Sequence, residues 1–140
     1  MTTKSSGFTL IELLVVVAIL GIIAAIGIVS YNGYVSSAKK TSAKNIMQQI
    51  SLGQTEYYSD NGFYYIQGNC TFSQADDSSS TDIETNLLGG SDSITKEVGY
   101  NICVASDASN YKILAKEDGG TCELTLLANG RFSPPDGKNC

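Results

Sequence analysis

The first strong pattern in this sequence is an apolar run from Phe8 to Val29, 22 residues that carry a single charged side chain, Glu12. At about 1.5 Å per residue, a helix of this length spans the roughly 30 Å hydrocarbon core of a bilayer. A carboxylate inside such a segment is costly unless it is paired, and the chain has no nearby positive charge within the run. The pattern therefore predicts a transmembrane helix over residues 8–30 whose acid is paired by another molecule.

From Tyr31 onward the pattern becomes amphipathic, with less polar residues at spacings of three and four. These predict one buried helical face: Val35, Ala38, Ser42, Ile46, Ile50, Gly53 and Tyr57. Lys40, Lys44 and Gln48 fall on the opposite, solvated side. We expect one helix from Phe8 to Tyr58, about 75 Å long, ending near the turn-forming residues 59–62. Its first half is apolar all round, and its second half has one face to bury.

The rest of the chain has a loop followed by strand patterns. Residues 67–97 are rich in Ser, Asp, Thr and Gly, which predicts an exposed loop, most clearly through Asp76–Asp82, with a short helix near Ile83–Leu88. Three segments with β-branched and aromatic residues follow: Val98–Ala105, Tyr111–Lys116 and Thr121–Ala128. Together they predict an α+β fold, in which a small antiparallel sheet packs on the amphipathic half of the long helix.

The four cysteines, Cys70, Cys103, Cys122 and Cys140, all follow the apolar run, and none forms a CxxC pair. Because the chain has no histidine, a zinc site would need four thiolates at unusual spacing. Two disulfides formed in an oxidising compartment are the simpler interpretation, and three pairings are possible. We favour Cys122–Cys140, since Cys140 and the turn-rich segment before it need an anchor, which leaves Cys70–Cys103. Closing the loop between Cys122 and Cys140 stabilises the fold by about 3 kcal/mol in the chain-entropy model.

Charge and composition exclude several functions. The full chain has a net charge of −5, and the part after Tyr58 has five basic and twelve acidic side chains, a net charge of −7. This argues against broad electrostatic binding of nucleic acid. The absence of histidine removes the usual general base, and no phosphate-binding glycine motif is present. The acidic tract lacks EF-hand spacing. We expect a protein that is not an enzyme and that needs no cofactor or metal.

The stretch Gly7-Phe-Thr-Leu-Ile-Glu12, followed by its apolar run, resembles the class III signal of type IV prepilins. The resemblance covers about Lys4 to Tyr34. It implies that a prepilin peptidase removes residues 1–7 as a leader, cutting between Gly7 and Phe8, and that Phe8 is then N-methylated. Glu12 becomes the fifth mature residue, where the family keeps a glutamate. The resemblance implies that this carboxylate forms a salt bridge with the amine of Phe8 in a neighbouring subunit.

The same resemblance implies a structural role. The domain over residues 31–140 would be a pilin globular domain, and many relatives close a C-terminal loop with a disulfide, as Cys122–Cys140 would. The precursor would cross the bacterial inner membrane once, and the mature subunit would polymerise into an extracellular, helical type IV pilus used for adhesion, motility or DNA uptake. Its partners would be further copies of itself, the prepilin peptidase and the pilus assembly machinery.

Two alternatives remain at this point. One is a pseudopilin of type II secretion, although the main pseudopilins usually lack this cysteine load and often bind calcium. The other is a minor or competence pilin that binds DNA, which a local basic strip would support and the net charge of −7 disfavours.

Overall fold

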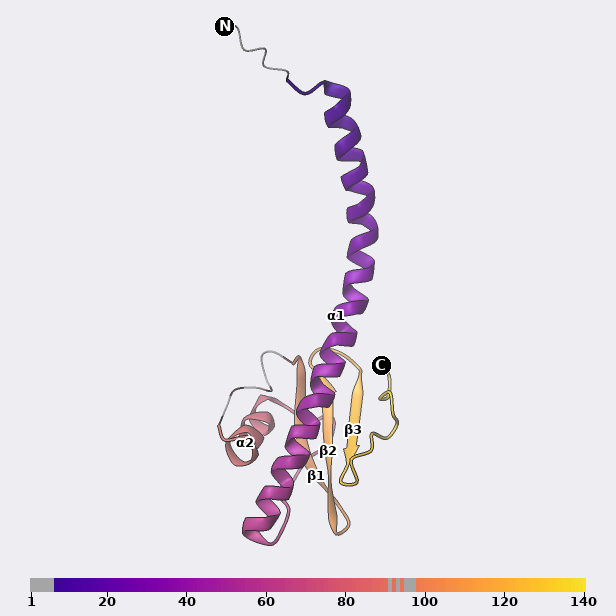
Figure 1. Ribbon diagram of the computed structural model, residues 1–140. Helices are drawn as coiled ribbons and strands as arrows, with labels where there is room; N and C mark the ends of the chain where they lie inside the picture. The colour runs from indigo at the N-terminus through magenta and orange to yellow at the C-terminus, as the bar shows by residue number, and fades with distance from the viewer. Residues whose placement is uncertain (1–6, 91, 93, 95–97) are drawn as a thin grey trace, which may run out of the picture. The chain divides into compact units, whose positions relative to one another are not determined.

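The computed structural model describes residues 7–90, 92, 94 and 98–140 (Figure 1). Helix α1 spans Leu10–Asn61 and helix α2 spans Asp77–Leu87; they are followed by the strands β1 (Tyr100–Asp107), β2 (Asn110–Glu117) and β3 (Glu123–Leu127). The predicted α+β class is confirmed. Close contacts divide the chain into an N-terminal unit that ends at Ser37 and a C-terminal unit, Ala38–Cys140. Most of the predicted leader, including Lys4, lies outside the described residues.

The three strands form one antiparallel sheet in the order β1-β2-β3. Strands β1 and β2 form a hairpin in which Asp107 pairs with Asn110, so the connecting turn is only Ala108 and Ser109. The sequence predicts a longer connection, over residues 106–110. The shorter turn is possible because Ala108 adopts a left-handed conformation with φ of 53°.

The main core lies between one face of the sheet and the part of α1 that belongs to the C-terminal unit. The helix contributes Ala43, Met47 and Ile50, and the fully buried residues of the sheet include Tyr100, Ile102, Val104, Ile113, Ala115, Leu124 and Leu126. The predicted helical face was partly wrong: Ile50 is buried and Ile46, Gly53 and Tyr57 are half-buried, but Ala38 and Ser42 are exposed. The buried residues of α1 are Ala43, Met47, Ile50 and Gln54, so they include a glutamine that the predicted face left out.

That glutamine, Gln54, is fully buried. Its Nε2 donates to the backbone oxygen of Tyr65 at 2.7 Å, and its Oε1 accepts from the backbone nitrogen of Tyr65 at 2.9 Å. A buried amide is tolerated when both its donor and its acceptor are satisfied, as here. Gln54 therefore fixes the chain that leaves the end of α1 against the helix.

The prediction that Lys44 lies on the solvated side of the helix was also wrong. Its Nζ donates to the backbone oxygen of Pro135 at 2.8 Å and lies 5.1 Å from the centre of the Phe132 ring. The long aliphatic part of a lysine can cover apolar surface while its charge finds a partner. Lys44 thus links α1 to the C-terminal segment.

The tract Asp76–Asp82 is not the exposed loop that its composition predicts, because it begins α2. Asp76 is the N-cap: its side chain accepts from the backbone nitrogen of Ser79 at 2.8 Å, and the Ser79 hydroxyl accepts from the Asp76 backbone nitrogen at 3.0 Å. Asp and Ser are good helix caps as well as loop residues. With the helix started there, Ser80 and Ile83 turn inward and are fully buried.

The structure joins Cys70 to Cys103 and Cys122 to Cys140, with Cα–Cα distances of 5.6 Å and 4.4 Å. These are the pairs favoured from the sequence. The first disulfide lies in a second, smaller core on the other face of the sheet, where Phe72 and Ala75 pack against Cys103, Ala105 and Leu114. The second holds the C-terminal segment beside β3, where Lys138 pairs with Glu123.

Candidate functional site

The N-terminal unit holds most of the residues to which the sequence assigns a function, and its helix begins with a capping box. Gly7, Phe8 and Thr9 are not helical, and α1 starts at Leu10. The Thr9 hydroxyl accepts from the backbone nitrogen of Glu12 at 3.3 Å. In return, Oε2 of Glu12 accepts from the backbone nitrogen and from the hydroxyl of Thr9, both at 2.8 Å. Thr9 is thus the N-cap, and the carboxylate lies at the amino end of the helix, where the helix dipole favours a negative charge.

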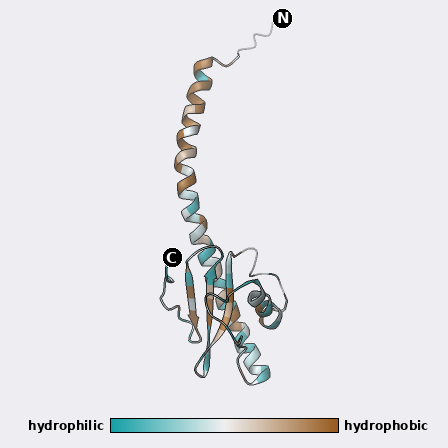
Figure 2. Ribbon diagram, turned by 180° about the vertical axis from the view of Figure 1, so that it is seen from behind, coloured by the Kyte–Doolittle hydropathy of each residue, from teal (hydrophilic) through white to brown (hydrophobic). Residues whose placement is uncertain are grey.

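The surface of this unit is apolar and uncovered within the chain. No residue from Gly7 to Ser37 is buried, and the large apolar side chains are exposed throughout, from Phe8 at 84% to Val29 at 76%. The N-terminal half of α1 is accordingly brown over most of its length in Figure 2. Among the described residues, α1 is the one helix that is long and apolar enough to cross a membrane. An uncovered apolar surface of this extent indicates a lipid or protein partner.

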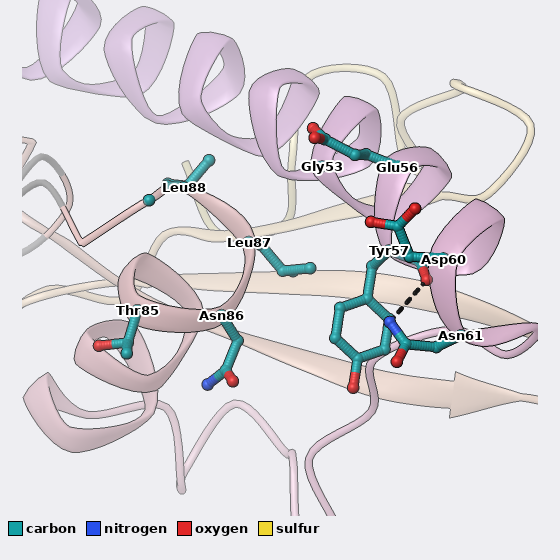
Figure 3. A pocket seen from close by; sticks show the side chains of 10 residues that line it. Gly53, Glu56, Tyr57, Asp60, Asn61, Thr85, Asn86, Leu87 and Leu88 are labelled. Atoms are coloured by element: carbon teal, nitrogen blue, oxygen red, sulfur yellow. Dashed lines mark hydrogen bonds between the residues drawn. The ribbon is translucent and has the colours of Figure 1, made fainter.

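The C-terminal unit has a hollow of about 470 Å³ between the ends of α1 and α2 (Figure 3). Its lining includes Glu56, Tyr57 and Asp60 from α1 and Thr85 and Asn86 from α2. Gly53 lets the two helices approach, since a Cβ atom there would lie 2.7 Å from the backbone oxygen of Leu87. Within the described ranges, no three His, Cys, Asp or Glu side chains are grouped so that they could hold a metal ion.

Comparison with protein families identifies the N-terminal region. A family model described as the prokaryotic N-terminal methylation motif matches residues 2–28, which include Gly7, Phe8, Glu12 and much of the apolar part of α1. The match, together with the long apolar helix, supports a type IV pilin. The long N-terminal helix, the small antiparallel sheet and the two disulfides match the pilin fold. No curated protein sequence matches the chain.

The motif has consequences for the processing of this chain. It implies processing by a prepilin peptidase and assembly into filaments. The apolar helix fits a membrane-anchored precursor. The structure places the predicted scissile bond, Gly7–Phe8, in the non-helical segment just before α1, and it places Glu12 in the first turn.

Thr9 is the residue of this segment to which the sequence reasoning assigned no role. A signal for it was present, because Thr9 and Glu12 have the spacing of a capping box directly before an apolar run. In this chain the two residues act together: the threonine starts the helix, and the glutamate accepts a hydrogen bond from the threonine backbone nitrogen.

Proposed function

We propose that this pilin is the structural subunit of a bacterial type IV pilus, which polymerises through its N-terminal apolar helix into an extracellular filament. The observation that carries the proposal is the combination of a fully uncovered apolar helix with one carboxylate in its first turn. Lipid covers such a helix before assembly, and the same helices of other subunits cover it afterwards. The two disulfides fit a subunit that works outside the cell.

In this proposal the chain has three segments with different roles. Residues 1–7 are the leader, and a prepilin peptidase removes it between Gly7 and Phe8. Residues 8–30 then anchor the subunit in the inner membrane, and residues 31–140 form the globular domain on the far side. The new amine of Phe8 is methylated. The peptidase and an assembly machinery act on the pilin, which does no chemistry itself.

Glu12 sets the register of assembly in this proposal. Cleavage creates an ammonium group at Phe8, and the carboxylate of Glu12 pairs with that group on the neighbouring subunit. The pairing is strong in an apolar surrounding, but the desolvation of both charges offsets much of the gain. Its main effect is therefore on specificity, since a subunit that docks out of step buries an unpaired charge. Repeated head-to-tail contacts of this kind do not close, so they produce a helical filament.

The test uses bacterial cells in which the only copy of the pilin is a variant. Removal of one partner of a buried ion pair costs about 3–5 kcal/mol, so Glu12→Val should reduce filaments by far more than about tenfold. The Glu12→Val precursor should still insert and be cut. Sheared filaments are counted by electron microscopy, and cleavage is followed as a shift on a gel. Ile11→Val, which changes an apolar neighbour, is the matched control and should assemble.

A second arm separates processing from assembly. Gly7→Val places a side chain at the scissile bond, so this variant should accumulate as uncut precursor. Wild-type filament yield from Glu12→Val would overturn the assembly role of the carboxylate. Normal trimming of Gly7→Val would overturn the assigned cleavage site and leave the role of Glu12 standing.

A further inference from the structure

The outward edge of β1 is covered by side chains where a fourth strand would otherwise lie. Strand β1 is at one end of the sheet, and its backbone groups on the free side include those of Ile102 and Val104. The nitrogen of Ile102 donates to the Ser80 hydroxyl at 3.0 Å, and its oxygen accepts from the Ser79 hydroxyl at 2.9 Å. All four edge groups of these two residues have a partner, since Val104 is also bonded on both sides.

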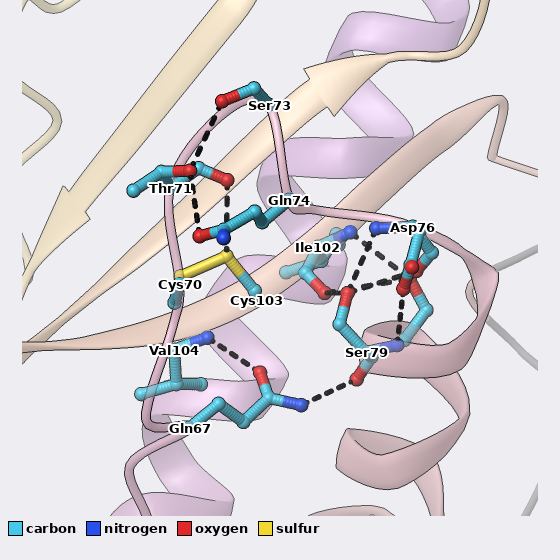
Figure 4. Close-up of a disulfide and its surroundings, with 11 residues drawn as sticks. Gln67, Cys70, Thr71, Ser73, Gln74, Asp76, Ser79, Ile102, Cys103 and Val104 are labelled. Atoms are coloured by element: carbon cyan, nitrogen blue, oxygen red, sulfur yellow. Dashed lines mark hydrogen bonds between the residues drawn. A yellow bond between two sulfur atoms is a disulfide. The ribbon is translucent and has the colours of Figure 1, made fainter.

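Gln67 provides both partners of Val104 and so replaces a strand residue. Its backbone nitrogen donates to the Val104 oxygen at 3.0 Å, and its side-chain Oε1 accepts from the Val104 nitrogen at 3.0 Å. The remaining amide group of Gln67 donates to the backbone oxygen of Ser79 at 2.9 Å, which joins it to α2 (Figure 4). We call residues 67–80 the edge strap.

The Cys70–Cys103 disulfide ties the edge strap to β1 at the centre of this edge. Cys103 lies between Ile102 and Val104 in the sequence, and its side chain is in the small core on the outer face of the sheet. Phe72 and Ala75 of the strap pack into the same core. The strap therefore passes from the edge to the outer face and returns to the edge at Ser79, with the disulfide as its one covalent link to the strand.

The opposite edge of the sheet is protected in a different way. Strand β3 is followed by a backbone segment that pairs with it, with hydrogen bonds from Leu127 to Arg131 and from Ser133 to Thr125. The Cys122–Cys140 disulfide closes the same segment further along the chain. The β1 edge has side chains as the main substitutes for strand pairing, and these depend on the strap staying in place.

We propose that the β1 edge is a latent strand-pairing surface, which the edge strap keeps closed, and that its alternative partner is β1 of a second copy of this chain. An open edge strand is a template for pairing with another chain. The central residues of β1 are uncharged and include Ile102 and Val104, which favour β structure. The edge is also self-complementary: in an antiparallel pair, Ile102 of each copy can exchange both hydrogen bonds with Val104 of the other.

This register fixes the position of Cys103 in the pair of strands. It lies on the two-fold axis of the antiparallel pair, opposite its own copy, in a position without direct backbone bonds. Cα atoms in such a pair are about 4.5 Å apart, which is within the range that a disulfide spans. Opening the strap while Cys103 stays free should therefore let the two thiols form an intermolecular disulfide.

The experiment uses the full chain in detergent micelles and compares Cys70→Ala with Cys103→Ala. Both variants lack the strap disulfide, but only the first keeps the thiol at the centre of the edge. Copper phenanthroline catalyses oxidation by dioxygen, in which two thiols lose two protons and two electrons to form one disulfide. We expect Cys70→Ala to form covalent dimers at least about tenfold faster than Cys103→Ala, because only the first thiol is held at disulfide distance. Equal rates would overturn the proposed register.

Amide hydrogen exchange tests the strap without relying on cross-linking. In Cys70→Ala, exchange at Ile102 and Val104 should rise at least about tenfold. The control Cys122→Ala/Cys140→Ala lacks the other disulfide and should keep these two amides protected. Loss of protection at Leu124 would show that Cys70→Ala fails to fold. In that case the strap is tested with variants of Gln67. Gln67→Ala should expose the Val104 amide, whereas Gln67→Glu keeps an acceptor oxygen for it. Unchanged exchange at Val104 in Gln67→Ala would overturn the strap.

The inference concerns Ala38–Cys140 alone and goes beyond the proposed function. Filament loss in Glu12→Val leaves the β1 edge untested, and an edge that stays closed in Cys70→Ala leaves the assembly role of Glu12 intact. The two proposals therefore fail separately.

Discussion

The N-terminal unit and the C-terminal unit treat apolar side chains in opposite ways. Between Gly7 and Ser37 no residue is buried, and Ile19, Ile23 and Ile28 all have more than half of their surface exposed. Between Ala38 and Cys140 the described aliphatic residues of the sheet face largely inward, and two disulfides close the loops around them. The first unit leaves its apolar surface to be covered by other molecules, whereas the second covers its own.

This difference shows where each unit gains the free energy of apolar burial. Apolar burial contributes about 25 cal/mol per Å², so a helix without buried residues gains that contribution only from lipid or from other subunits. The C-terminal unit gains it within the chain. Substitutions in the first unit should therefore change assembly and leave unfolding alone, and substitutions in the core of the second should do the reverse.

The largest effect on unfolding is expected from Gln54→Leu. The leucine keeps the volume but leaves the backbone nitrogen and oxygen of Tyr65 without their buried partner. Each unsatisfied buried group costs about 1–3 kcal/mol, so we expect a loss of about 3 kcal/mol in the free energy of unfolding. The measurement is urea denaturation followed by circular dichroism.

The matched control for Gln54→Leu lies in the other unit. Leu14→Ala removes apolar volume, whereas Gln54→Leu removes none. Because Leu14 is exposed, the urea transition of the C-terminal unit should nevertheless stay at the same urea concentration. A shift of similar size in both variants would break the comparison, because it would mean that the two units unfold together.

The sequence predicted the N-terminal unit better than the packing of the C-terminal unit, and the reason is physical. The long apolar run needs no partner to be recognised as a helix, since its length and lack of charge are sufficient. Gln54, Ser80 and Glu84 are buried polar residues, and each depends on a contact far away in the sequence. The Glu84 carboxylate, for example, accepts from the backbone nitrogen of Ile94 at 2.6 Å. Hydrophobic periodicity does not identify such residues as buried, because it contains no information about their partners.

The same limit explains α2 and the β1 edge. A run of Asp and Ser predicts a loop until one of them is known to cap a helix, as Asp76 does. The role of Gln67 could not be predicted, since a glutamine that replaces a strand residue has no local pattern. The ends of the strands were predicted to within two residues, because β-branched residues and glycine turns mark them locally.

A smaller effect is expected from alkaline pH. Burial raises the pKa of Tyr100 to about 12, and the nearby Glu117 carboxylate adds to the increase. An exposed tyrosine in the unfolded chain has a pKa near 10. Above that pH the unfolded state loses this proton before the folded state does, so stability is fully present below pH 10 and declines as the pH rises towards 12. At pH 12 the free energy of unfolding should be lower by about 2 kcal/mol.

The decline is measured as the urea midpoint between pH 8 and pH 12. Tyr100→Phe should remove most of the slope, although Tyr65, whose pKa burial also raises, contributes in the same direction. Tyr31→Phe alters an exposed tyrosine of the N-terminal unit and shows whether loss of any tyrosine has the effect. If Tyr100→Phe leaves the slope of the wild type, the buried phenol is not its source.

The smallest effect is expected from Lys44→Met, which removes a hydrogen bond and a cation–π contact between α1 and the C-terminal segment. The methionine keeps the aliphatic part of the side chain but loses the bond to the Pro135 oxygen and the position of the charge near Phe132. An exposed hydrogen bond and a cation–π contact together contribute about 1 kcal/mol, so the urea midpoint should fall only slightly. Lys40→Met, one turn earlier on α1, is the control for loss of positive charge.

Because the Cys122–Cys140 disulfide holds the segment independently, Lys44→Met in Cys122→Ala/Cys140→Ala should cost more than it does in the wild type. An identical cost in both backgrounds would mean that the lysine and the disulfide do not act on the same segment.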